Sequence, residues 1–184
     1  MNFRIHILGA SGSGTTSLAK ALSTSLEVTH FDADDFFWIQ TDPPYQKTRP
    51  ALPREELLLG ELNKTTSWVL SGWIDGWDKS IILLFTHAVF LAIPSDLRMS
   101  RLEKRESERF GNNILPGGIQ YEEYTRFMNW AKAYDTAGME QRSRVLHESI
   151  ISRLKVPVIR IEGDTTLLER LSIVTREITR WSRN

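Results

Sequence analysis

The organisation of this chain can be inferred from one segment near its start, Gly9-Ala10-Ser11-Gly12-Ser13-Gly14-Thr15-Thr16-Ser17. The residues before it, Ile5-His6-Ile7-Leu8, have the composition of a buried β-strand, and those after it, Leu18-Ala19-Lys20-Ala21-Leu22, begin a helical pattern. A strand, a Gly-rich turn and a helix start place successive backbone N–H groups around one point, where the helix dipole adds roughly half a positive charge. The segment therefore predicts a cradle for an anion.

The spacing of the glycines indicates that this anion is a phosphate. Gly9-x4-Gly14-x-Thr16 fits the phosphate-loop pattern G-x-x-x-x-G-K-[ST] at every fixed position except the lysine. Glycine is needed where the backbone turns with positive φ and where phosphate oxygens approach it closely. The residues expected to bind the phosphates of ATP or another nucleoside triphosphate are Gly9, Gly12, Ser13, Gly14, Thr15, Thr16 and Ser17. The alternative is a Gly/Ser-rich turn without a ligand.

The one departure from the pattern is Thr15, which occupies the lysine position. A lysine there normally neutralises charge on the β- and γ-phosphates, whereas a threonine offers only a hydroxyl. Another group must then supply a cation, or phosphoryl transfer will be slow. The substitution thus bears on catalysis more than on binding.

Length and composition limit the other possibilities. With 184 residues, of which 41% are hydrophobic, the chain can bury one good core, so we expect one domain over residues 1–184 with an inserted lid. The formal net charge is zero, which gives no electrostatic case for a nucleic-acid or anionic-membrane partner. There is no cysteine, which excludes disulfide, thiolate-zinc and thiol-nucleophile chemistry and leaves the redox compartment unmarked. There is also no secretory leader pattern and no apolar run long enough to span a membrane, so we expect a cytoplasmic protein, which is a monomer or a homodimer.

Short β-rich runs alternate with helical segments along the chain, which is typical of a parallel sheet with helices on both faces. The runs expected to form this five-stranded sheet are Ile5–Leu8, 27–32, 68–72, 88–93 and Val158–Ile161. The intervening helices include a long one for which Ser95 is the expected N-cap. The Pro-rich segment 41–50 is expected to be a loop over the mouth of the site, where Lys47 and Arg49 either contact an anionic acceptor or are merely solvated.

Two aspartates lie where the second strand of the sequence ends. Ligands of open α/β sheets bind at the carboxyl ends of the strands, so Asp32 and Asp34 are expected beside the opening of the phosphate loop. Asp32 is expected to hold Mg²⁺ together with the Thr16 hydroxyl, and Asp34 to orient or deprotonate an acceptor hydroxyl. The alternative is that Asp34 or Asp35 merely caps the following helix.

Arginines follow the fourth strand of the sheet. Arg101, Arg105 and Arg109 recur at steps of four and share one helix face, which is either a solvated surface paired with nearby glutamates or a source of positive charge for the phosphates. The Gly-rich segment 110–118 has the composition of a closing lid or its hinge. The lid region is therefore expected at about residues 105–120.

This order of parts resembles the small P-loop kinases of the adenylate kinase, shikimate kinase and gluconate kinase group over nearly the whole chain. The run Phe90-Leu91-Ala92-Ile93-Pro94 followed by Arg101 and Arg105 is similar to the pattern in which the first arginine lies against adenine and the second reaches the phosphates from the lid. Gly163 matches the loop that wraps the adenine in that group.

The resemblance extends to the two unusual features of the site. The pair Asp32-x-Asp34 is similar to the shikimate-kinase arrangement of one acid for the metal and one for the acceptor hydroxyl. The lysine-free ending Gly12-Ser13-Gly14-Thr15-Thr16 resembles archaeal cytidylate kinases and uncharacterised adenylate-kinase-like proteins. The resemblance implies an ATP- and Mg²⁺-dependent phosphotransferase with Asp34 and Arg105 as catalytic residues and a small molecule or nucleotide as acceptor. The alternative is a nucleotide-binding protein or slow NTPase switch without such an acceptor.

Overall fold

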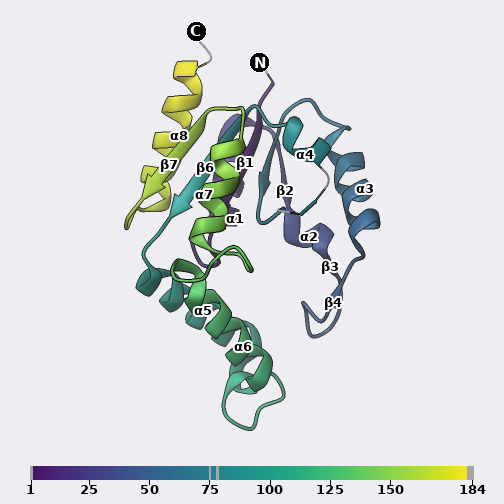
Figure 1. Ribbon diagram of the computed structural model, residues 1–184, viewed down its shortest axis with the longest axis vertical. Coiled ribbons are helices and arrows are strands. Elements are labelled where there is room, and N and C mark those ends of the chain that lie inside the picture. Colours follow the sequence, from purple (N-terminus) through teal and green to yellow (C-terminus); the bar gives the residue numbers. More distant parts are fainter. Residues whose placement is uncertain (1, 75, 78, 182–184) are drawn as a thin grey trace.

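The centre of the molecule is a parallel sheet. The computed structural model describes residues 2–74, 76–77 and 79–181 (Figure 1). Five strands are arranged in the order β2-β5-β1-β6-β7, and all four pairings are parallel. The strands are Arg4–Gly9 (β1), Thr29–Asp32 (β2), Trp68–Ser71 (β5), His87–Ala92 (β6) and Val158–Glu162 (β7). The predicted α/β fold with a five-stranded parallel sheet is confirmed.

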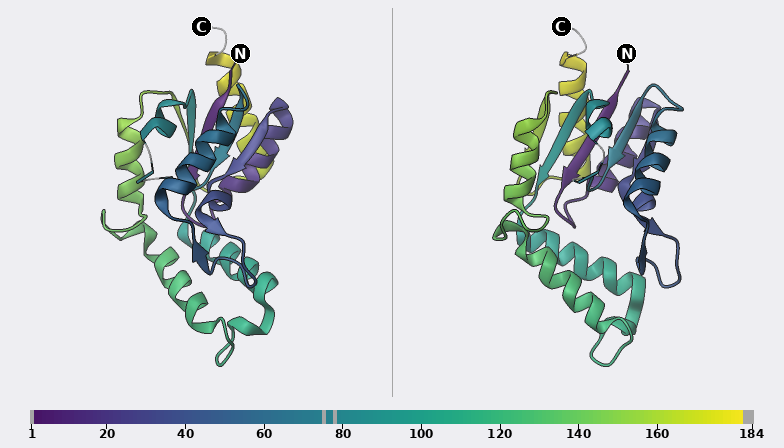
Figure 2. Two further views of the ribbon diagram at one scale, coloured as in Figure 1. Left: turned by 90° about the vertical axis from the view of Figure 1, so that its right-hand side faces the viewer. Right: turned by 45° about the vertical axis from the view of Figure 1, so that its right-hand side comes forward.

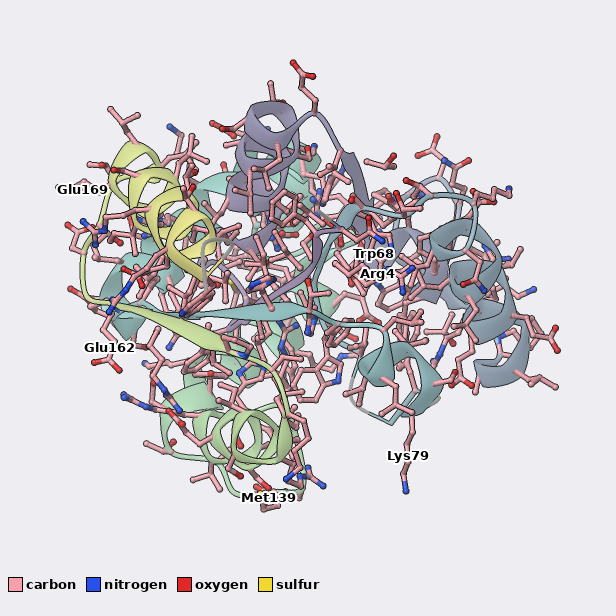
Figure 3. All side chains as sticks on the ribbon, turned by 90° about the horizontal axis from the view of Figure 1, so that it is seen from above. Arg4, Trp68, Lys79, Met139, Glu162 and Glu169 are labelled. Carbon is pink, nitrogen blue, oxygen red and sulfur yellow. The ribbon has the colours of Figure 1, made fainter. Side chains whose placement is uncertain are left out.

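Helices lie on both faces of this sheet because alternate strand residues are apolar on each side. Ile7, Val89 and Ile161 face α1 (Thr15–Leu26) and α8 (Leu167–Trp181), whereas Leu70 and Phe90 face the opposite layer. The opposite layer consists of α3 (Ala51–Leu62), α4 (Lys79–Leu83) and α7 (Arg144–Arg153). Figure 2 shows the sheet between these layers in two further views. In Figure 3 the labelled Lys79 and Met139 point outward from the body.

A pair of helices extends from the carboxyl end of the sheet, below the body in Figures 1 and 2. They are α5 (Ser95–Phe110) and α6 (Tyr121–Lys132), followed by the 3₁₀ turn η2 (Ala133–Asp135), and they pack through Leu102, Met128 and Ala131. The segment 105–120, where the lid was expected, is the tip of this hairpin, with the 3₁₀ turn η1 (Gly111–Ile114) at the bend.

Two local expectations were wrong. Residues 41–50 are not a loop throughout, because β3 (Trp38–Ile39) pairs antiparallel with β4 (Lys47–Thr48) and the Pro-rich segment connects them. Strands of two residues show no periodicity that a sequence pattern could reveal. The N-cap of α5 is Pro94 rather than Ser95, which is the first helical residue.

Within the described ranges, none of the helices is both long enough and apolar enough to cross a lipid bilayer.

Candidate active site

The phosphate loop connects β1 to α1 in a conformation that only glycine accommodates. Gly12 and Gly14 have φ of 79° and 89°. A Cβ on Gly12 would lie 2.5 Å from the carbonyl oxygen of Arg98, and one on Gly9 would lie 2.8 Å from that of Leu91. The loop is therefore pressed against the carboxyl end of β6 and the first turn of α5, and side chains at these positions would deform it.

The mouth of this loop consists of backbone donors. Thr15, Thr16 and Ser17 form the first turn of α1, so their N–H groups have no partner within the helix. The first intrahelical bond runs from Leu18 N to the Gly14 carbonyl oxygen, at 3.0 Å. Ser13 is buried beneath the loop. The expected phosphate-binding residues thus share one concave turn, with Thr15 at the lysine position.

Asp32 connects β2 to the phosphate loop. One of its carboxylate oxygens accepts a hydrogen bond from the Thr16 hydroxyl at 2.8 Å, and the other accepts one from the Asp34 backbone N–H at 3.1 Å. The second bond makes Asp32 the N-cap of α2 (Ala33–Phe37), so the alternative in which Asp34 or Asp35 is the cap was wrong. The structure therefore places a hydroxyl and a carboxylate side by side where Mg²⁺ was expected.

Asp34 lies on the wall of a cavity in front of the loop. The loss of hydration there, followed by the negative charge of Asp32, raises the pKa of Asp34 above its usual value, while the positive charges of Arg142 and Arg105 act in the opposite direction. A carboxylate with a raised pKa binds a proton more readily, which is the property required of a general base.

The cavity has a volume of about 410 Å³ and lies between the β3–β4 hairpin and the helices α5 and α6. Ser11 from the phosphate loop, Asp34 and Arg105 line it, together with aromatic side chains from both sides that include Trp38, Tyr45, Phe127 and Trp130. In the aromatic run 36–38, Phe36 and Phe37 pack against the core, whereas Trp38 faces the cavity. The cavity therefore combines flat apolar walls with charges of both signs.

The arginines of α5 face different surroundings. Arg98 is fully buried and donates to the Ile93 carbonyl oxygen at 2.9 Å. Arg101 lies 3.8 Å from Asp164, next to Gly163, at the end of the site where a nucleoside base was expected. Arg105 and Arg109 share the carboxylate of the buried Glu106, at 2.7 and 3.3 Å, and Arg109 also lies over the Tyr45 ring. Arg49 instead donates to the Phe36 carbonyl oxygen, so its side chain supports the hairpin.

Two arginines beside the loop were missed by the sequence reasoning. Arg142, from the turn before α7, donates to the Gly9 carbonyl oxygen at 2.5 Å and lies over Trp73. Arg170, from α8, donates to the Ser13 carbonyl oxygen at 2.7 Å. These contacts join residues 133 and 157 positions apart, so no local pattern could have revealed them.

Comparison with known proteins gives one relative by sequence and several by structure. The chain is 44% identical over 174 residues to the uncharacterized protein YqaC of Bacillus subtilis (strain 168), which covers 95% of this chain and 96% of that protein. No family model matches the chain.

Three kinases illustrate the structural likeness. A gluconokinase from Sinorhizobium meliloti 1021 has a TM-score of 0.56 at 13% identity, covering 99% of this chain and 94% of that one. The shikimate kinase of Acinetobacter baumannii, in complex with shikimate, has a TM-score of 0.56 at 15% identity, with 98% and 94% covered. Deoxyadenosine kinase from M. mycoides with bound dATP has a TM-score of 0.55 at 12% identity, with 96% and 100% covered. The fold of the chain is that of small P-loop kinases.

Proposed function

We propose that this chain, which belongs to the same family as the Bacillus subtilis protein YqaC, is a P-loop phosphotransferase that uses ATP or another nucleoside triphosphate. Its acceptor is a small molecule or a nucleotide bound in the cavity under the lid. One observation carries the proposal: Ser11 of the phosphate loop, Asp34 and Arg105 line a single cavity. A γ-phosphoryl group held by the loop therefore leaves it directly into the space where an acceptor binds.

The loop fits a polyphosphate by its shape and its donors. Gly9 and Gly12 let the loop lie against β6 and α5 without a clash, and the N–H groups at the start of α1 match phosphate oxygens. Arg101 and Gly163 then lie beside the nucleobase of the bound nucleotide. The lysine-free loop makes the protein an adenylate-kinase-like member of the group in which cations from other elements take over the role of the lysine.

The oxygens of Thr16 and Asp32 suit Mg²⁺, which prefers hard oxygen ligands and keeps several waters. When bound, this ion neutralises charge on the phosphates. Asp34 positions the acceptor hydroxyl and takes its proton as the acceptor oxygen bonds to the γ-phosphorus. The bond from the γ-phosphorus to the bridging oxygen breaks, and the nucleoside diphosphate leaves with that oxygen. Arg105, on the opposite wall, stabilises the charge on the transferring group once it exchanges Glu106 for phosphate.

The proposal is tested by turnover with a panel of acceptors. Nucleosides, nucleoside monophosphates, sugars and sugar acids are incubated with Mg·ATP, and ADP release and the phosphorylated product are both measured. We expect one class to raise ADP release well above the acceptor-free rate, with equal product formed. Trp38→Ala is the accompanying variant, because loss of a cavity wall raises KM for the acceptor and leaves ATP affinity unchanged.

Turnover that no acceptor changes would support a different function. Arg105 and Arg109 are both engaged by Glu106, and Thr15 is neutral, as expected for a nucleotide-dependent switch with slow hydrolysis. In that case ATP and ADP would bind, and hydrolysis would proceed slowly without a phosphorylated product.

A further inference from the structure

Arg170 is a buried arginine whose side chain reaches from α8 to the phosphate loop. Only 4% of its surface is exposed. Its Nε donates to the Thr165 hydroxyl at 2.8 Å and its Nη1 to the Ser13 carbonyl oxygen at 2.7 Å. The same Nη1 lies 3.1 Å from the position of a Cβ on Gly14. The guanidinium is therefore fixed against the residues that precede the missing lysine.

The charge of this guanidinium is not matched by a carboxylate in direct contact. Its Nη2 is buried and has no hydrogen-bond partner among the residues that the structure describes. Asp164 lies against Arg101, and Glu169 is engaged by the N–H and hydroxyl of Thr166 at the outer edge of α8 (Figure 3). Burial and the nearby charge of Arg101 lower the pKa of Arg170, while the more weakly acting charges of Asp164 and Glu169 oppose this shift, and an arginine remains protonated in proteins.

A buried cation without a carboxylate in contact lowers the free energy of unfolding, and a bound anion can offset this cost. Neutral partners hold Nε and one N–H of Nη1, so both N–H groups of Nη2 and the second N–H of Nη1 are left for an anionic ligand. Nη1 lies against Ser13 and Gly14 of the phosphate loop, next to the N–H groups at the start of α1. The second cation source, Arg105, differs because it is 45% exposed and already paired with Glu106.

We propose that Arg170 supplies the fixed positive charge that Thr15 fails to provide, and that the polyphosphate of the bound nucleotide is its counter-ion. The inference rests on the proposed function, because it assigns the group that holds the phosphates of the same site. In this chain the positive charge that a P-loop lysine would supply comes from a residue of another helix, and this charge strengthens ground-state binding. Arg105 acts separately, at the stage of transfer.

The test is binding of ATP and of inorganic tripolyphosphate, measured by calorimetry without any acceptor. Arg170→Gln retains a donor for the Ser13 carbonyl oxygen and removes the charge, and Arg170→Lys retains the charge. We expect Arg170→Gln to weaken both ligands by at least about tenfold, and Arg170→Lys by much less, since a charge close to a phosphate contributes on this scale. The dependence of affinity on salt should also become shallower in Arg170→Gln.

The deciding variant is Thr15→Lys combined with Arg170→Gln. Restored tripolyphosphate affinity in this double variant supports the proposal, because a lysine at the consensus position replaces the lost charge without repairing any contact of Arg170. Arg176→Gln is the matched control, since this exposed arginine lies on the same helix and pairs with Glu177 at 3.5 Å. Its affinities should equal those of the wild type.

Unchanged tripolyphosphate affinity in Arg170→Gln would overturn the inference and leave the proposed function standing. If Arg170→Gln lowers tripolyphosphate affinity and adding Thr15→Lys does not restore that affinity, the inference is also overturned, because Arg170 then only supports the loop. If Arg170→Gln does not fold, Thr15→Lys alone decides: a gain of less than about threefold supports an existing charge, and a large gain refutes it. A wild-type protein that binds neither ligand would refute the proposed function itself.

Discussion

The arginines at the two ends of the site are held in opposite ways. Arg142 and Arg170 are fixed against the phosphate loop, and each donates to a loop carbonyl oxygen. Arg105 and Arg109 lie on α5, in the segment where we expect the lid, and share one carboxylate, Glu106. One group of cations is in place before any ligand binds, and the other must exchange its partner to act.

This difference predicts that nucleotide binding and phosphoryl transfer depend on different residues. Groups that are already oriented bind the ground state and the transition state alike, whereas a contact formed only on closure favours the transition state. We therefore expect changes at the loop to alter nucleotide affinity and changes at the lid to alter turnover.

The largest expected effect is that of Gly14→Val. Gly14 has φ of 89° and a Cβ there would lie 3.1 Å from Nη1 of Arg170, so the added side chain strains the backbone and distorts the turn that we expect to hold the phosphates. Two or more hydrogen bonds to a charged ligand are lost, which weakens ATP binding by roughly 1,000-fold. Calorimetry measures this, with Gly60→Val as control because no atom lies within 4 Å of a Cβ on that helical glycine. Equal ATP affinity in both variants would show that the loop does not bind the nucleotide.

The variant Arg105→Lys tests whether the arginines of α5 act on turnover rather than on nucleotide affinity. The planar fork that grips two phosphate oxygens is lost, so we expect turnover to fall by about 10³-fold while ATP affinity changes little. Single-turnover kinetics and calorimetry measure the two quantities, and Arg180→Lys, on an exposed face of α8, serves as the control. A fall in ATP affinity equal to the fall in turnover would show that the lid arginine binds the ground state as well.

Asp34→Asn is expected to reduce turnover by about 100-fold, near the lower end of the range for a general base, because phosphoryl transfer depends more on positioning than on proton removal. The raised pKa of Asp34 has a defined sign: the carboxylate gains a proton as pH falls, so the acidic limb of the kcat/KM profile should lie above 3.8, the usual value. The variant should lack this limb. A wild-type profile that is flat from pH 4 to 7 would argue against Asp34 as the base.

The smallest expected effect concerns His6, a buried residue of the core that belongs to neither group of arginines. Burial lowers the pKa of His6 from 6.5 to about 4, although its hydrogen bond to the Gly72 carbonyl oxygen opposes the shift. The unfolded chain therefore binds a proton in this window that the folded protein does not, and stability falls as pH drops from 6.5 towards 4, by up to about 1.4 kcal/mol per unit. Urea unfolding at several pH values measures this slope. We expect a shallower slope in His6→Phe, and an unchanged one would assign the effect to other groups.

The parts of the molecule that sequence reasoning predicted well are those in which neighbouring residues cooperate. Strand β1, the Gly-rich turn and the start of α1 lie within one continuous segment, so their periodicity and composition determine the local structure. The same holds for β5 and β6, whose apolar runs are buried on both faces, and for β7, in which buried and exposed residues alternate. The roles assigned to Asp34, Arg105 and the metal-side residues stay predictions.

The residues that were missed acquire their position only through the fold. Arg170 lies in an ordinary amphipathic helix, and nothing in its neighbourhood along the chain distinguishes it from the exposed Arg176. Its burial depends on the packing of α8 against α1, which brings it to a carbonyl oxygen of the loop. Likewise, Asp32 rather than Asp34 caps α2 because the helix begins at Ala33, directly after the last residue of β2.

The contact between Gly12 and the carbonyl oxygen of Arg98 gives the phosphate loop mechanical leverage over the lid. Arg98 lies at the base of α5, anchored to Ile93 and Asp135, and this helix of 16 residues is about 24 Å long. Arg105 and Arg109 lie about 10 and 16 Å along the helix from Arg98, so a rotation of α5 by about 5° about its base displaces them by about 0.9 and 1.4 Å. We expect phosphate in the loop to reach the two arginines by this route, because the loop is pressed against the base of the same helix.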